Sequence, residues 1–100
     1  MLFEVRNPGK KIQEICKALG EEYSIKVVDL ENVIYRDLGN GYDFEVSNLD
    51  NRKKSLDARL YIWDTRKTEV VETISDIHTI EELKTALDGA VEKYQSLAAE

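Results

Sequence analysis

The chain has 100 residues, 42% hydrophobic and 34% charged, which is typical of an ordinary folded protein with one domain over residues 1–100. Its formal net charge of −6 argues against unspecific binding of nucleic acid or an anionic membrane, and it suits either plain solubility or a basic partner. The single Cys excludes an internal disulfide, and no apolar run reaches the roughly 18 residues that span a membrane, so we expect a cytoplasmic protein without a leader peptide.

The first predicted helix begins at Asn7-Pro8, because Asn is a good N-cap and Pro fits the first helical position. Gly20 is the expected end of this helix. Its apolar stripe contains Ile12, Ile15, Cys16 and Leu19, so Cys16 is expected to be a buried structural thiol. Before the helix, Leu2, Phe3 and Val5 predict a short edge strand or a segment packed beneath it.

Four β-strands are predicted between the helices. The first is formed by residues 25–28 and continues past a bend or bulge at residues 30–32 into residues 33–38. Residues 33–38 and 42–46 then flank Gly39-Asn40-Gly41, which is typical of a hairpin turn.

This hairpin allows two registers, which differ in where the turn is centred. One places Arg36 opposite Asp43 and the other places Arg36 opposite Glu45. In both registers the same side chains share the expected core face: Val33, Tyr35, Tyr42, Phe44 and Val46.

Residues 56–64 and 69–74 predict two further strands joined by a turn at residues 65–68. Alternation places Leu60 and Ile62 on the core face and Tyr61 and Trp63 on the other. A tight turn would put Trp63 beside Val70. By the same register, Ile62 would lie opposite Val71, Leu60 opposite Thr73, and Tyr61 beside Glu72.

The last element is a helix with a capping box, in which Thr79 is the N-cap and Glu82 the third helical residue. An apolar stripe follows at helical spacing: Leu83, Leu87, Ala90, Val91, Tyr94 and Leu97. The predicted fold is therefore α+β in the order α-β-β-β-β-α, with both amphipathic helices packed on one face of a mainly antiparallel four-stranded sheet.

No catalytic or cofactor motif accompanies this fold. The phosphate-binding glycine loops and the G-x-S-x-G elbow are absent, and the only His, His78, has no Cys nearby with which to hold a metal. The basic residues Arg52, Lys53 and Lys54 lie in a loop next to the aromatic strand, but the sheet itself carries carboxylates (Asp57, Asp64, Glu69 and Glu72) instead of the basic surround that base stacking needs. We therefore predict that the protein is not an enzyme, needs no cofactor or metal, and does not bind nucleic acid or membranes directly.

The first functional hypothesis is a protein-binding module, because an exposed Tyr and Trp bury much area at interfaces with few torsions to freeze. Its partner would be another protein or a second copy, giving a homodimer. The residues proposed for this contact are Tyr61, Trp63, Val70, Glu72 and Ile74. The alternative is that Trp63 belongs to a second small core.

The other functional hypothesis is an acidic mimic of nucleic acid. The size, acidity and α+β layout resemble small phage and mobile-element inhibitors that occupy restriction or CRISPR nucleases, although no motif carries this resemblance. The carboxylates that strands and bends would group are Asp29, Glu31, Asp37, Asp43 and Glu45. Binding of this kind would weaken steeply with salt.

Overall fold

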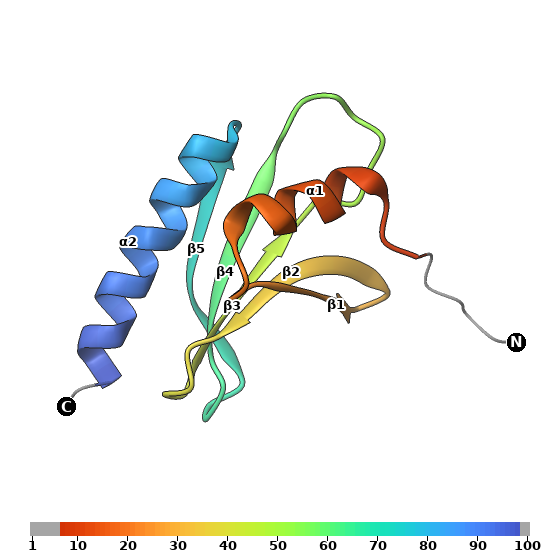
Figure 1. Ribbon diagram of the computed structural model, residues 1–100. Helices are drawn as coiled ribbons and strands as arrows, with labels where there is room; N and C mark the ends of the chain where they lie inside the picture. The colour runs from red at the N-terminus through yellow and green to blue at the C-terminus, as the bar shows by residue number, and fades with distance from the viewer. Residues whose placement is uncertain (1–6, 99–100) are drawn as a thin grey trace, which may run out of the picture.

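The computed structural model, which describes residues 7–98, has two helices and a five-stranded antiparallel sheet with the strand order β1-β2-β3-β4-β5 (Figure 1). The elements are α1 (Lys10–Leu19), β1 (Ser24–Val28), β2 (Glu31–Asp37), β3 (Tyr42–Ser47), β4 (Ala58–Asp64), β5 (Glu69–Ile77) and α2 (Ile80–Ala98). The predicted α+β class is confirmed. The edge strand proposed at Leu2, Phe3 and Val5 lies outside the described residues. Within them, no helix is long and apolar enough to cross a membrane.

The prediction of four strands is wrong by one, because the chain reverses at Asp29-Leu30 and does not merely bend. Both residues have positive φ, 49° and 66°, and Val28 lies opposite Glu31 across the turn. Two consecutive left-handed residues produce a tight hairpin whose twist matches that of its strands. The sequence lacks the Gly that usually marks such a turn, so the hairpin was interpreted as a bulge.

The β2–β3 hairpin has a register one residue away from both predicted ones. Its connection is a three-residue turn in which Gly39 and Gly41 have positive φ, and the Leu38 N–H donates to the Tyr42 carbonyl at 3.1 Å. An odd number of turn residues moves the pairing by one position compared with a two-residue turn. Arg36 therefore lies opposite Phe44, not opposite Asp43 or Glu45.

This shift reverses the faces of β2. Ile34 pairs with Val46 and joins the core, whereas Val33 and Tyr35 point to the opposite side of the sheet from Phe44. Val33 is buried, but it does not belong to the main hydrophobic cluster. The predicted core face was wrong for Val33 and Tyr35.

A β-bulge divides the β4–β5 hairpin. Trp63 pairs with Val70, as predicted, but the register then shifts between Ile62 and Trp63 so that Ile62 pairs with Glu72. Because the extra residue changes which β5 side chains face each way, Glu72 and Ile74 lie on the helix-covered face. The predicted pairings of Ile62 and Leu60 with Val71 and Thr73, and of Tyr61 with Glu72, are wrong.

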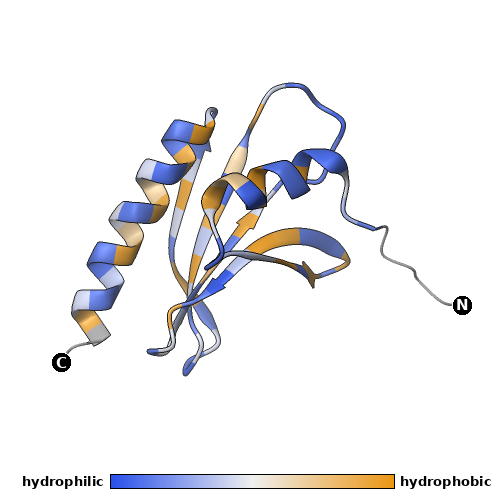
Figure 2. Ribbon diagram, viewed as in Figure 1, coloured by the Kyte–Doolittle hydropathy of each residue, from blue (hydrophilic) through white to orange (hydrophobic). Residues whose placement is uncertain are grey.

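Both helices pack on the same face of the sheet, and their apolar sides meet strand residues in one core (Figure 2). Leu60 and Ile62 are fully buried there, as predicted. The remaining members of the buried cluster are Ile12, Ile15, Tyr23, Ile34, Phe44, Val46, Leu49, Leu56, Ala58, Ile77, Leu83, Leu87, Ala90 and Tyr94. The sheet face opposite the helices is therefore not covered by either helix (Figure 2).

Helix α1 begins at Lys10 and not at Asn7-Pro8, while its predicted end at Gly20 is confirmed. Gly9 precedes the helix in an extended conformation, and its N–H donates to Asp50 Oδ1 at 3.0 Å. A carboxylate near a helix N-terminus also interacts favourably with the helix dipole. Since Asp50 is 41 positions away in the chain, local sequence could not reveal this contact.

Helix α2 begins with the predicted capping box. The Glu82 N–H donates to Thr79 Oγ1 at 3.0 Å, and Glu82 Oε1 accepts from the His78 N–H at 2.9 Å. The reciprocal bond thus reaches one residue further back than in the usual arrangement.

Replacing Thr79 with Ala should lower the free energy of unfolding by about 1 kcal/mol, because the Glu82 N–H loses its acceptor at the helix end. Urea denaturation followed by circular dichroism measures the change. Thr85→Ala is the control, an exposed Thr inside the same helix, and it should change stability by less than about 0.5 kcal/mol. Equal effects of the two substitutions would contradict a capping role.

Candidate functional site

The face of the sheet opposite the helices carries aromatic and acidic side chains together. Strand alternation places them in two cross-strand rows, because neighbours across antiparallel strands share a face. The first row is Tyr35, Glu45, Tyr61 and Thr73, and the second is Asp37, Asp43, Trp63 and Val70. We call this surface, with the adjoining Asp29 and Glu31, the acidic–aromatic face.

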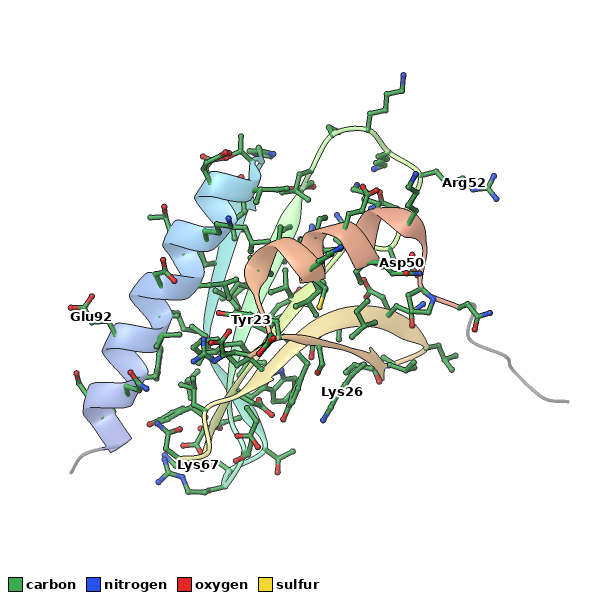
Figure 3. The ribbon with its side chains drawn as sticks, in the orientation of Figure 1. Tyr23, Lys26, Asp50, Arg52, Lys67 and Glu92 are labelled. Carbon is green, nitrogen blue, oxygen red and sulfur yellow. The ribbon has the colours of Figure 1, made fainter. Side chains whose placement is uncertain are left out.

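Each central carboxylate of this face accepts a hydrogen bond from an aromatic neighbour. The Tyr35 hydroxyl donates to Asp43 Oδ2 at 2.8 Å, and Trp63 Nε1 donates to Glu45 Oε1 at 3.2 Å. Lys26, which points away from α1 in Figure 3, places its ammonium 3.8 Å from the centroid of the Tyr35 ring. The rings are therefore held in place at the sheet surface and are not loose side chains.

The five carboxylates proposed from the sequence are close enough to influence one another. Burial raises the pKa of Glu45, and the charges of Glu31, Asp29 and Asp43 raise it further. Burial also raises the pKa of Asp43, to which Asp37 adds its repulsion from the paired position on β2. Within residues 7–98, no Lys or Arg forms an ion pair with Asp43 or Glu45. The face therefore concentrates negative charge, which the charge of Lys26 offsets in part by lowering the pKa of Asp43.

Two hollows lie side by side on the acidic–aromatic face and share Glu45 and Trp63. One has a volume of about 260 Å³ and is lined by Val28, Tyr35, Asp43, Glu45, Trp63, Thr65 and Thr68. The other has a volume of about 280 Å³ and is lined by Asp29, Glu31, Glu45, Ser47, Tyr61, Trp63 and Val70. Because Trp63 and Glu45 line both hollows, members of the aromatic and the acidic sets proposed from the sequence contribute to one surface.

Two residues proposed for the aromatic contact lie elsewhere. Glu72 Oε1 accepts hydrogen bonds from the Tyr94 hydroxyl at 2.6 Å and from Lys93 Nζ at 3.0 Å, and both donors belong to α2. Ile74 packs against the main core. Tyr61, Trp63 and Val70 do share a face, as predicted. The sequence analysis missed Tyr35 as a member of it, and only the correct β2–β3 register could have revealed it.

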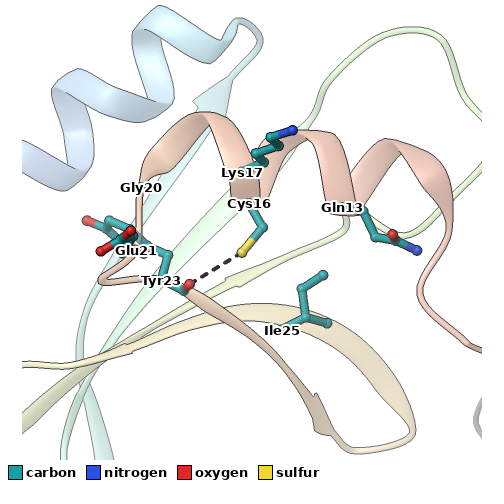
Figure 4. Close-up of a pocket in the computed structure, with 7 residues that line it drawn as sticks. All are labelled: Gln13, Cys16, Lys17, Gly20, Glu21, Tyr23 and Ile25. Carbon is teal, nitrogen blue, oxygen red and sulfur yellow. Dashed lines mark hydrogen bonds between the residues drawn. The ribbon is translucent and has the colours of Figure 1, made fainter.

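A larger hollow of about 450 Å³ lies between α1 and β1, next to Cys16 (Figure 4). Cys16 was predicted to be buried but is only partly buried against the core. Its thiol donates to the Tyr23 carbonyl at 3.5 Å, and desolvation raises the pKa of the thiol. A thiol that is harder to ionise is a weaker nucleophile. The residues that line this hollow include a single carboxylate, Glu21, so it lacks the grouped negative charge of the acidic–aromatic face.

Metal ligands are not grouped in the part of the chain that the structure describes, where no three His, Cys, Asp or Glu side chains could together hold a metal ion. His78 lies at the start of α2, and its Nδ1 is 3.0 Å from the Leu56 carbonyl oxygen. This contact ties the helix start to the loop before β4.

The pH dependence of stability should reveal the opposite environments of two carboxylates. The raised pKa of Glu45 means that its charge destabilises the fold, so Glu45→Gln should raise the urea midpoint at pH 7. That gain should shrink as the pH falls through the raised pKa and vanish below 4.5, the ordinary value.

Glu72→Gln is the matched substitution with the opposite expectation. Hydrogen bonds from Tyr94 and Lys93 lower the pKa of Glu72, so its stabilisation is complete above 4.5 and is lost as the pH falls through the lowered pKa. At pH 7 this substitution should cost about 1 kcal/mol, since the carboxylate is partly exposed. If both variants changed stability in the same direction at pH 7, the assignment of charge repulsion to the acidic–aromatic face would be wrong.

Comparison with known proteins identifies no relative. No protein-family model, curated protein or solved structure matches the chain. The geometry and electrostatics of the acidic–aromatic face are therefore the grounds on which a function is proposed.

Proposed function

We propose that the protein is a non-enzymatic binding module that holds a basic surface of another protein on its acidic–aromatic face. The observation that carries this proposal is the coincidence of Tyr35, Tyr61 and Trp63 with five carboxylates on one sheet face, opposite the helices. Aromatic rings supply contact area, and carboxylates select the charge of the partner.

The electrostatics of the face favour a cationic partner. Asp43 and Glu45 are partly buried, and their charges repel one another and those of Asp29, Glu31 and Asp37. An incoming Lys or Arg would relieve this repulsion, while the folded protein without a partner bears its cost. Strained arrangements of this kind are typical of functional surfaces.

Self-association through the same face is a weaker proposal than capture of a basic protein. A two-fold dimer brings the same patch of both copies together, so the carboxylates would oppose each other. Like charges facing each other across an interface cost several kcal/mol. A protein of opposite charge meets no such penalty.

The second candidate function is mimicry of nucleic acid, in which the basic partner is a nucleic-acid-binding enzyme. The observation that favours it is that the charges of Asp29, Glu31 and Asp43 all raise the pKa of Glu45, because carboxylates close together on one surface can occupy a groove meant for phosphates. In this case charge would dominate over the aromatic rings. The two experiments below separate these readings.

The double variant Asp43→Asn with Glu45→Gln should weaken binding of a hexalysine peptide about tenfold at 50 mM salt, because it removes the central charges of the face. The matched control is Glu81→Gln with Glu92→Gln, which changes the net charge equally on α2, where Glu92 points away from the sheet (Figure 3). Isothermal calorimetry measures both. Equal weakening would show that net charge alone attracts the peptide, and would refute this face as the binding site.

Trp63→Ala should keep the fold, as measured by circular dichroism, because Trp63 lies opposite the main core. Hexalysine binding should fall about tenfold or more if the indole is a central contact. Unchanged binding with a steep salt dependence would favour nucleic-acid mimicry, and a melted fold would show that Trp63 is core.

Sedimentation of the unsubstituted protein should give a monomer, and a dimer lost on substitution of Trp63 would favour self-association.

A further inference from the structure

We infer that the hollow between Tyr35 and Trp63 binds the guanidinium group of an arginine side chain from the partner. This inference rests on the proposed function and names the residue type that anchors the basic partner. It concerns the hollow of about 260 Å³, in which two aromatic rings and two carboxylates line one concavity.

Hydrogen bonds hold both carboxylates of the hollow in place and use only one oxygen of each. The Tyr35 hydroxyl donates to Asp43 Oδ2, and Trp63 Nε1 donates to Glu45 Oε1. Within the described residues, no side chain donates a hydrogen bond to Asp43 Oδ1 or Glu45 Oε2. Because the two residues are two positions apart on β3, their Cα atoms are separated by roughly 7 Å. A planar group that donates from two edges suits such a pair of acceptors, and guanidinium is the side-chain cation with that geometry.

The aromatic walls distinguish arginine from lysine. Guanidinium is weakly hydrated and stacks on ring faces, whereas an ammonium holds its water strongly and presents a point charge. Elsewhere in this chain arginines already lie over tyrosines: Arg36 is 5.2 Å from the centroid of Tyr23, and Arg66 is 5.3 Å from that of Tyr42.

The Trp63 ring has no such cation. Among the described residues, each Lys or Arg that lies over a ring does so over a Tyr. Indole is the best partner for a cation among the aromatic side chains. The ring best suited to an arginine is therefore the one left for a partner, and it borders both hollows of the acidic–aromatic face.

A peptide comparison tests the inference. Three peptides of the same length carry Arg, Lys or citrulline at three positions separated by Gly, and each is titrated into ¹⁵N-labelled protein. Trp63 is the only Trp in the chain, so its single indole N–H resonance reports occupancy of the hollow directly. The Arg peptide should bind about fivefold more tightly than the Lys peptide, with the larger indole shift, and the uncharged citrulline peptide should not bind.

The failures of the two proposals are distinguishable. Equal affinity for the Arg and Lys peptides would overturn the arginine inference and leave the basic-partner proposal intact. Binding of neither peptide at low salt would overturn the proposed function itself. Binding of citrulline as tightly as Arg would also overturn the arginine inference, because the charge would then be irrelevant.

Calorimetry on substituted proteins provides a second test that does not depend on the indole signal. Trp63→Phe keeps a ring and should retain the preference for Arg over Lys, whereas Trp63→Leu should abolish it. Glu92→Gln, exposed on α2, is the control and should leave the preference unchanged. A Trp63→Leu variant that folds, as judged by circular dichroism, and still prefers Arg would overturn the inference.

Discussion

The register of the antiparallel pairs is the constraint on which the rest of this structure depends. Side chains alternate between the faces of a strand, so one residue of displacement exchanges the buried set for the exposed set. The odd turn at Gly39-Asn40-Gly41 sends Ile34 to the core and Tyr35 to the far face. Without that displacement Tyr35 would lie under the helices, Asp43 would lose its hydrogen-bond donor, and the acidic–aromatic face would lack its third ring.

Much of the fold could be predicted from the sequence because local signals determine it. The capping box at Thr79, the inward direction of Leu60 and Ile62, and most of both helix stripes follow from spacing alone. The exception is Leu97, which was predicted in the stripe of α2 and is exposed. The wrong predictions of strand pairing and helix start have a common cause, because each concerns a turn, a long-range contact or a bulge that the spacing of residues does not encode. Asp29-Leu30 forms a tight turn without glycine, Asp50 caps α1 from a distant loop, and the bulge beside Ile62 redirects Glu72 toward α2.

The candidate site was predicted in part for the same reason. Tyr61 and Trp63 share a face because they are two positions apart on β4, and Val70 joins them because it pairs with Trp63 before the bulge. Glu72 and Ile74 lie beyond the bulge. The acidic and aromatic sets were treated from the sequence as competing hypotheses. The sheet brings them onto one surface, because β3 places Asp43 and Glu45 beside Tyr35 on one flank and beside Tyr61 and Trp63 on the other. Spatial coincidence of this kind comes from pairing and is invisible in a linear pattern.

The bulge between Ile62 and Trp63 lets β5 contribute side chains to both faces of the sheet. On the turn side of it, Val70 belongs to the acidic–aromatic face, and on the other side Glu72 and Ile74 hold α2 through a hydrogen bond and core contacts. A regular strand would tie these two sets into one alternation, so that any slip at the tip would also misplace the helix contacts. The bulge therefore lets one strand contribute to both faces of the sheet, with Val70 beside Trp63 and with Glu72 and Ile74 against α2 and the core.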